Sequence, residues 1–166
     1  MGIKVLVTGG SGFLGTRLKL KNPDWVYISS KEVDLTVYDE CINLFKKYTP
    51  DAIIHLAAKV GGIKENSENP AEFFDTNVLI NTNVLKAAQE TGIKRVLSSL
   101  STCTFPDVVD TYPFTEEDIL SGPPAITNRA YGFAKRALYI QTLAYREQYG
   151  VNYSCFCPSN IYGPND

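Results

Sequence analysis

Residues 5–18 read VLVTGGSGFLGTRL: an apolar run, a glycine-rich turn and the start of a stretch with helical period. A strand, a glycine turn and a helix in this order predict a dinucleotide-binding loop. Gly9 would permit the tight turn, Gly12 would let the backbone approach a pyrophosphate, and Gly15 would let the helix pack closely on the sheet. The free N–H groups and the dipole of the helix N-terminus would favour that anion. The alternative is a glycine-rich turn without a ligand.

The rest of the chain continues the alternation that this stretch begins. Short β-branched or aromatic runs occur at residues 3–8, 25–29, 52–56, 95–99 and 152–156. Stretches of helical period lie near residues 13–20, 38–49, 71–91 and 129–149. The alternation predicts an α/β fold, a Rossmann-like doubly wound parallel sheet with helices on both faces. We expect residues 1–166 to form one domain, and the Pro-rich connection at 104–128 to be functional because it is long.

The composition excludes several functional classes. The 166 residues carry a formal net charge of -2, which provides no polycationic surface for nucleic acid. No stretch approaches the ~20 apolar residues of a membrane span, and the start MGIKVLVTGG predicts a strand and a turn, not a secretion signal. We therefore expect a cytoplasmic protein with neither a nucleic-acid nor a membrane partner.

The four cysteines, Cys41, Cys103, Cys155 and Cys157, predict neither a metal site nor disulfides. They follow no metal-ligand spacing, and a cytosolic chain keeps its thiols reduced. Cys155 and Cys157 alternate along an expected strand, so we expect them to be packing residues.

The end of the second expected strand bears on the choice of cofactor. An NAD site ordinarily has a carboxylate there for the ribose 2′-hydroxyl, whereas this chain has Ser29, Ser30 and Lys31. The sequence therefore favours NADP, with Lys31 or a serine near the 2′-phosphate, although Lys31 is equally explained as a solvated loop charge. Glu32 is free to turn inward. Asp34 suits a contact near the adenine, or an ordinary turn.

A tyrosine and a lysine begin the last expected helix. Tyr131 and Lys135 in NRAYGFAKRAL are four residues apart and so share a helix face. A tyrosine transfers protons poorly at neutral pH unless an ammonium stabilises its phenolate, and Lys135 can supply that charge. Ser101, at the end of the preceding strand, can reach the same point and hydrogen-bond a substrate carbonyl. Together these residues resemble the catalytic set of the extended short-chain dehydrogenase/reductase superfamily.

Asn77 is a smaller clue. Phe73, Ile80 and Val84 share its helix face, so its amide would lie among apolar groups, where an unpaired amide is costly. We expect it either to be a satisfied structural amide or to border the active site.

Cys103 stands two residues after Ser101, and a simple ketone reductase needs no thiol there. One explanation is a general base that removes a proton from the carbon beside the carbonyl. Epimerisation and reduction would then share one site.

These features resemble the GDP-L-fucose synthase family, NADPH-dependent 3,5-epimerase/4-reductases that act on GDP-4-keto-6-deoxy-D-mannose. The blocks that carry the resemblance span the chain: VTGGSGFLG (7–15), SSKEVDLT (29–36), HLAAKVGGI (55–63), LSTCTFP (100–106), YGFAK (131–135) and PSNIYGP (158–164). The resemblance implies that Ser101, Tyr131 and Lys135 form the reductase set and that Cys103 is the base. The residues expected to bind NADP(H) are Gly9, Gly12, Phe13, Leu14, Gly15, Ser30, Lys31, Asp34, Leu35, Leu56, Ala57, Ala58, Tyr131, Lys135, Pro158, Asn160 and Ile161.

The resemblance also implies missing parts. The family pairs its cysteine with a histidine acid beyond the GP-H-D turn, and a C-terminal domain holds the GDP-sugar. Here the turn reads GPND, with Asn165 where the family commonly has the histidine of that turn, and the chain ends at Asp166, before the position of the histidine acid. The single histidine, His55, ends an expected strand and is expected to be structural. We therefore expect a cofactor-binding and catalytic half that is inactive alone.

The resemblance further implies a homodimer, because the family packs the helices equivalent to 71–91 and 129–149 into a four-helix bundle. Val84, Leu138 and Leu143 are candidates for that seam and equally for the core. Two other interpretations of the chain remain open: another extended-type sugar-nucleotide epimerase or 4,6-dehydratase, and a non-catalytic NADPH-binding module.

Overall fold

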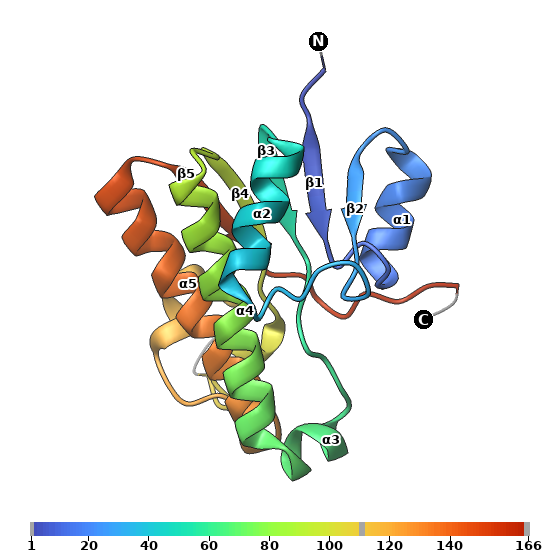
Figure 1. Cartoon of the computed structure of the whole chain (residues 1–166). Helices are drawn as coiled ribbons and strands as arrows, with labels where there is room; N and C mark the ends of the chain where they lie inside the picture. Colours follow the sequence, from blue (N-terminus) through green and yellow to red (C-terminus); the bar gives the residue numbers. More distant parts are fainter. Residues whose placement is uncertain (1, 110–111, 165–166) are drawn as a thin grey trace.

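The computed structural model of the chain describes residues 2–109 and 112–164. In this part a five-stranded parallel sheet has the order β2-β1-β3-β4-β5 (Figure 1). The strands are β1 Val5–Thr8, β2 Val26–Ile28, β3 Ala52–His55, β4 Arg95–Ser99 and β5 Asn152–Phe156. The predicted Rossmann-like α/β class is confirmed, since each apolar run expected to form a strand contains one.

The helices also lie close to the predicted ranges. They are α1 Phe13–Lys21, α2 Tyr38–Tyr48, α3 Ile63–Glu68, α4 Pro70–Glu90 and α5 Arg129–Tyr149. Short 3₁₀ helices are η1 Thr102–Thr104, η2 Glu116–Leu120 and η3 Ile126–Asn128. The sequence analysis missed α3 and the 3₁₀ helices because segments this short do not complete a readable period.

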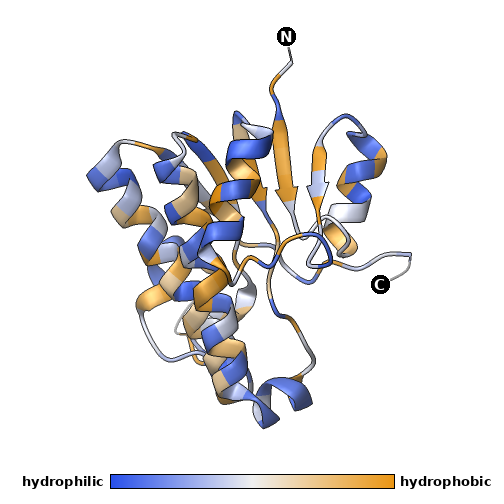
Figure 2. Ribbon diagram, in the orientation of Figure 1, coloured by the Kyte–Doolittle hydropathy of each residue, from blue (hydrophilic) through white to orange (hydrophobic). Residues whose placement is uncertain are grey.

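One face of the sheet carries most of the core. α4 packs against both α2 and α5, and inward side chains of α2, α4 and α5 form one cluster with those of the strands. Figure 2 shows the apolar strands between helices whose outer sides are polar. Val84 and Leu138 are buried in this cluster, so they are core residues and not the dimer seam that was one of their two expected roles.

The second face is only partly covered. The chain crosses the sheet in one direction from β1 to β2 and in the other direction from β2 to β3. Because such crossovers are right-handed, α1 and α2 lie on opposite faces of the sheet. On β4 the side chain of Leu97 is 38% exposed, which is unusual for an inner parallel strand. We had expected helices to cover both faces of the sheet. In the described residues they cover the second face only in part.

The carboxyl ends of the strands lie at one edge, and this edge positions the site. The register aligns Thr8, His55, Ser98 and Cys155 in one row across β1, β3, β4 and β5. The strand order reverses at β1 and β3, which makes their carboxyl ends the topological switch point where ligands bind in open α/β sheets.

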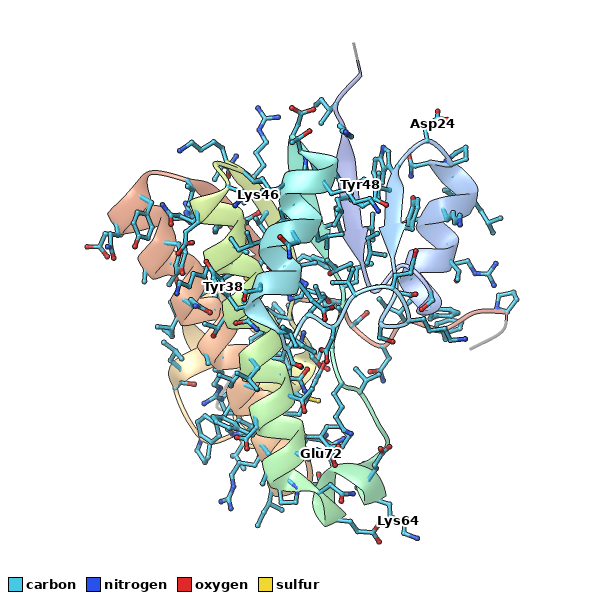
Figure 3. The ribbon with its side chains drawn as sticks, in the orientation of Figure 1. Asp24, Tyr38, Lys46, Tyr48, Lys64 and Glu72 are labelled. Carbon is cyan, nitrogen blue, oxygen red and sulfur yellow. The ribbon has the colours of Figure 1, made fainter. Side chains whose placement is uncertain are left out.

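Charged side chains such as those of Asp24, Lys46 and Lys64 are exposed and point outward (Figure 3). Within residues 2–109 and 112–164, no helix combines the length and apolarity that crossing a membrane requires. Cys157, expected to pack, is exposed instead because it lies just beyond the end of β5, whereas Cys155 is half-buried and its thiol donates to the Thr142 hydroxyl at 3.4 Å.

Candidate active site

A cavity of about 990 Å³ opens at the switch point. Its walls come from the loop after β1, the end of β2, the segment after β3, the start of α5 and the segment after β5. The predicted residues that line it are Gly9, Gly12, Phe13, Leu14, Gly15, Ser30, Asp34, Leu35, Leu56, Ala57, Ala58, Ser101, Tyr131, Lys135, Pro158, Asn160 and Ile161. Lys31 and Cys103 do not line this cavity.

The glycine loop has the geometry that an anion requires. Gly9 has a φ of 72°, in the left-handed region, and a side chain on Gly15 would collide with the Gly9 carbonyl. A Cβ on Gly12 would lie 3.2 Å from the Gly9 carbonyl oxygen, a close contact with backbone and the only atom within 4 Å. Gly12 is also the N-cap of α1, whose first turn has neither a capping side chain nor an acidic residue. The N–H groups at the start of α1 are thus available, and the loop fits a pyrophosphate.

The loop after β2 is organised by two carboxylates. Glu32 Oε2 accepts hydrogen bonds from the backbone N–H and hydroxyl of Ser29, at 2.9 and 2.8 Å, and these bonds lower the pKa of Glu32. Asp34 Oδ1 accepts from the hydroxyl and backbone N–H of Thr36, which lowers the pKa of Asp34. Glu32 therefore turns toward Ser29, and Asp34 has a turn role while it also lines the cavity. Lys31 is exposed.

Lys135 and Tyr131 lie together at the inner end of the cavity. The Lys135 ammonium donates to the Ser99 carbonyl at 2.8 Å and lies 5.7 Å from the centroid of the Tyr131 ring. Burial lowers the pKa of Lys135 to about 8. Burial also raises the pKa of Tyr131 to about 12, with a smaller contribution from the charge of Cys103.

The expected stabilisation of a Tyr131 phenolate by Lys135 stays a prediction. The ammonium is directed to a backbone carbonyl and to the face of the ring, so burial dominates the ionisation of Tyr131. Tyr131 is therefore a protonated phenol at neutral pH. Such a group suits proton donation rather than proton removal.

Ser101 and Cys103 are held together by the turn at η1. The backbone N–H of Cys103 donates to Ser101 Oγ at 3.2 Å. The half-buried Cys103 thiol lies 3.5 Å from the amide nitrogen of Asn128, which donates to it. The sequence analysis did not identify Asn128, because its contact with Cys103 joins positions that are 25 residues apart in the chain.

Asn77 has both of the roles considered for it. The side chain is fully buried, and its Oδ1 accepts from the backbone N–H of Lys59 at 3.0 Å. Its amide nitrogen donates to the carbonyls of Lys59 and Phe73. Asn77 is thus a satisfied amide that fixes a segment of the cavity wall. Lys59, which forms an ion pair with Glu72 at 2.6 Å, lines the cavity and was missed, although a charge four residues after a strand was a usable signal.

His55 lies beneath the site as a structural link. Since Asn81 Oδ1 can only accept, the His55 Nε2–H donates to it at 3.1 Å, and the Thr8 hydroxyl donates to Nδ1 at 2.7 Å. Burial and then the Lys135 charge lower the pKa of His55 to about 3, so the ring is neutral. This placement agrees with the structural role expected for it.

Two expectations remain, one on the position of Asn165 and one on metal binding. Asn165, which stands where the resemblance implies a histidine, lies outside the described residues. Within residues 2–109 and 112–164, no cluster of three or more His, Cys, Asp or Glu side chains is arranged to hold a metal ion.

Comparisons with known proteins agree with this architecture and confirm the resemblance to GDP-L-fucose synthases. A probable GDP-L-fucose synthase of Drosophila melanogaster is 44% identical over 98% of this chain and 53% of its own length. A GDP-L-fucose synthase of Dictyostelium discoideum is 42% identical over 98% of this chain and 52% of its own. The structure of a GDP-L-fucose synthetase from Naegleria fowleri bound to NADP matches with a TM-score of 0.88 and 39% identity, over 99% of this chain and 56% of that one.

The chain spans about half the length of the curated relatives it matches. A model of the NAD dependent epimerase/dehydratase family matches residues 5–166, a range that includes the glycine loop, all five strands and the cavity between them. By this match the chain belongs to the NAD dependent epimerase/dehydratase family.

Proposed function

We propose that this chain is the cofactor-binding and catalytic half of an NADPH-dependent 3,5-epimerase/4-reductase that converts GDP-4-keto-6-deoxy-D-mannose to GDP-L-fucose. The observation that carries the proposal is the grouping of Ser101, Cys103, Tyr131 and Lys135 beside a dinucleotide-shaped cavity. The names of the relatives support the choice of substrate.

The cofactor of this proposal is NADP(H), which supplies the hydride when bound. The free N–H groups of the first turn of α1 would hold its pyrophosphate, and Ser29 and Ser30 line the wall at the end of β2. The NADP in the Naegleria fowleri structure supports this choice. The predicted binding residues that line the cavity are the proposed contacts, and Lys31 is the weakest of the set because it is exposed.

In the epimerisation, the Cys103 thiolate removes a proton from the carbon beside the substrate carbonyl. The C–H bond breaks, the proton goes to sulfur, and the electron pair moves onto the carbonyl oxygen, where Ser101 and Tyr131 hydrogen-bond it. Return of a proton to the opposite face inverts the centre. The acid that returns it is not among the groups proposed here.

In the reduction, Tyr131 donates its phenolic proton to the carbonyl oxygen as hydride reaches the carbon. Ser101 orients the carbonyl, and the Lys135 ammonium stabilises the phenolate that forms. Because burial sets the pKa of Lys135 near 8, its charge is present at neutral pH and is lost in more alkaline solution.

The two steps are electrostatically coupled through Cys103 and Tyr131. A negative charge on Cys103 raises the pKa of Tyr131, so the acid stays protonated while the base is charged. One site can therefore hold a base and an acid without proton exchange between them.

Two other functions fit parts of the same site. Another extended-type epimerase or 4,6-dehydratase would need Tyr131 and Lys135 but not the thiol, so Cys103→Ser would leave its activity nearly intact. A non-catalytic NADPH-binding module would need neither Cys103 nor Tyr131. The half-buried Cys103 thiol next to Ser101 favours the epimerase/reductase.

The experiment that tests the proposal has two parts. Calorimetric titration of the 166-residue chain with NADPH and with NADH should show clearly tighter binding of NADPH. Because the chain alone is expected to be inactive, the second part uses the whole enzyme to which we assign it. Incubation of that enzyme with GDP-4-keto-6-deoxy-D-mannose in D₂O should give cysteine-dependent deuterium uptake beside the carbonyl, abolished in Cys103→Ser. NADPH binding together with deuterium uptake that survives Cys103→Ser would reject the epimerase role of the thiol.

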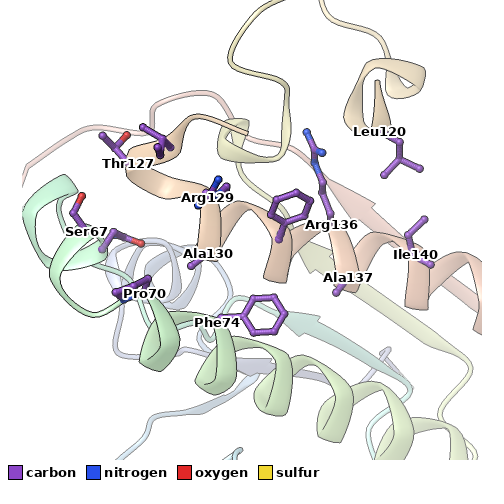
Figure 4. Close-up of a pocket in the computed structure, with 13 residues that line it drawn as sticks. Ser67, Pro70, Phe74, Leu120, Thr127, Arg129, Ala130, Arg136, Ala137 and Ile140 are labelled. Atoms are coloured by element: carbon purple, nitrogen blue, oxygen red, sulfur yellow. The ribbon is translucent and has the colours of Figure 1, made fainter. Parts of the chain in front are cut away.

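We also propose that the chain forms a homodimer through α4 and α5. A groove of about 970 Å³ runs between these helices, with α3, η2 and η3 at its rim, and Phe74 projects from α4 toward α5 (Figure 4). Phe74 and Ile140 are 39% and 46% exposed, which is high for apolar groups on packed helices.

The dimer is tested by sedimentation velocity. Ile140→Glu should convert a dimer to a monomer because it places a charge in the apolar groove. Leu20→Glu, at a 74% exposed position on α1, is the matched control and should leave the association unchanged. A monomeric wild-type chain at high concentration would reject the proposal.

A cytoplasmic location completes the proposal. The proposed base must remain a free thiol, and all four cysteines are free in the structure. A reducing compartment preserves that state.

A further inference from the structure

Asn128 is an N-cap residue whose side chain does not cap its helix. Asn is among the preferred N-caps because its side-chain oxygen usually accepts from an N–H of the first turn. At the start of α5 that bond is absent. The Asn128 amide nitrogen instead donates to Cys103 Sγ, at 3.5 Å.

Asn128, the last residue of η3 and the N-cap of α5, begins a row of residues that faces η1 and continues along α5. Gly132 and Arg136 follow at four-residue intervals and therefore lie on the same helix face. A side chain on Gly132 would collide with the Cys103 carbonyl, and Arg136 Nε donates to the Thr104 carbonyl at 2.6 Å. The three residues thus contact the sulfur and carbonyl of Cys103 and the carbonyl of the next residue, which fixes α5 against the turn that carries the thiol.

This row is adjacent to the one that carries Tyr131 and Lys135. α5 and its N-cap therefore present two sets of residues: Tyr131 and Lys135 toward the cavity, and Asn128, Gly132 and Arg136 toward η1. Rotation or displacement of α5 would move both sets together. The distance between the proposed base and the proposed acid is accordingly set by the packing of α5 against η1.

A hydrogen bond to sulfur has a different effect on thiol and thiolate. The thiol sulfur is a weak acceptor, whereas a charge-assisted bond to the thiolate is roughly twice as strong as a neutral one. Among the described side chains, Asn128 is the one recorded as a hydrogen-bond donor to Cys103 Sγ. The nearby cation, Lys135, is bonded to Ser99 instead. A neutral donor of this kind orients the thiolate and favours it without neutralising it.

We infer that Asn128 is the positioning residue for the Cys103 base, and that its amide N–H orients the thiolate toward the substrate. This inference rests on the proposed function of Cys103. It extends that function by naming the group that acts on the base.

The test compares three variants in the 166-residue chain. Asn128→Asp removes the donor but keeps an effective N-cap, because a carboxylate there is favoured by the helix dipole. Asn128→Ala removes the donor without adding charge. Asn69→Asp makes the same change at the N-cap of α4, whose side chain likewise makes no capping bond, and is the matched control.

The readout is the rate of Cys103 alkylation by iodoacetamide as a function of pH, with the modified peptide identified by mass. Asn128→Asp should slow alkylation at pH 7.5 about tenfold, and Asn128→Ala several-fold, with both rate–pH profiles displaced to higher pH. Asn69→Asp should match the wild type. A displaced profile is not expected from a purely structural role, and thermal unfolding of each variant shows whether the fold is retained.

Two results would overturn the inference. One is a Cys103 alkylation rate in Asn128→Ala equal to that of the wild type, with slower alkylation in Asn128→Asp alone. This result would assign the effect to the added charge. The other is an unchanged profile in both variants. NADPH titration of the same proteins separates this inference from the proposed function. If NADPH binds and the alkylation profiles are unchanged, only the positioning role of Asn128 is rejected. If the profiles are displaced but NADPH does not bind, only the proposed cofactor role is rejected.

Discussion

The two ends of the cavity are built from different parts of the chain. At β1, backbone atoms form the site: Gly9 and Gly12 leave space, and the free N–H groups at the start of α1 point into it. At β4, side chains form it, with Ser101, Tyr131 and Lys135 converging from a strand end and a helix. The first end depends on residues adjacent in sequence, and the second on the packing of α5 against η1.

This difference separates binding from chemistry. A backbone site is sensitive to added atoms and indifferent to side-chain acidity, because its donors are peptide groups. A side-chain site is sensitive to the loss of a single proton donor, even when its shape is preserved. Substitutions at the two ends should therefore affect different measurements.

The largest effect is expected from Tyr131→Phe. In the whole enzyme to which we assign the chain, loss of the phenolic proton should lower the rate of NADPH oxidation with the keto-sugar by roughly 10²- to 10⁴-fold, while the ring still fills its place. NADPH affinity, measured by calorimetry, should change little. Tyr139→Phe, two turns further along α5, is the matched control and should retain activity. Equal loss in both variants would mean that the comparison between the two ends is wrong.

Gly12→Val should weaken NADPH binding, whereas Tyr131→Phe should lower the catalytic rate and leave NADPH binding nearly unchanged. Its β-branched side chain would occupy the space where an anion approaches, so NADPH affinity should fall about 100-fold, or about 2.7 kcal/mol. Thermal stability should fall slightly, because a Cβ at Gly12 would lie 3.2 Å from the Gly9 carbonyl oxygen, a close contact with backbone. Gly62→Val is the control: Gly62 is also an uncapped N-cap with extended backbone and has open space around it. Similar affinity losses in the two variants would contradict a backbone-built anion site.

The same difference explains what could be predicted from the sequence. Five apolar runs and a glycine loop are local signals, and they predicted the strands, the loop and the cavity wall. The pairing of Asn128 with Cys103, the contact of Lys59 with Asn77 and the direction of the Lys135 ammonium were not predicted. Each of these depends on where two distant segments meet.

Burial was the other property that periodicity did not determine. Val84 and Leu143 both fit a helix-face pattern, yet Val84 is fully buried and Leu143 is 39% exposed. The raised pKa of Tyr131 has the same origin, because desolvation depends on neighbours that the local sequence does not specify.

Acid should lower the stability of the fold through His55, the only histidine of the chain, which lies beneath the cavity. Its pKa is about 3 when folded and near 6.5 when unfolded, so the unfolded chain takes up a proton over that interval and the folded chain does not. Stability is therefore fully present above pH 6.5 and is lost as the pH falls, by about 2 kcal/mol between pH 8 and pH 5. Urea unfolding at several pH values measures this loss, and His55→Asn should flatten it. An equal slope in the variant would assign the loss to other groups.

The smallest effect is expected from Lys31→Ala, and it decides how the β1 end recognises the nucleotide. Lys31 is exposed and does not line the cavity, and salt screens such charges, so NADPH affinity should fall less than about threefold at physiological ionic strength. Lys64→Ala, on the exposed surface of α3, gives the background effect of a lost lysine. A loss above tenfold for NADPH but not NADH would show that Lys31 reaches the 2′-phosphate. The β1 end would then recognise its ligand with a charged side chain as well as with backbone, and its contrast with the β4 end would be one of degree.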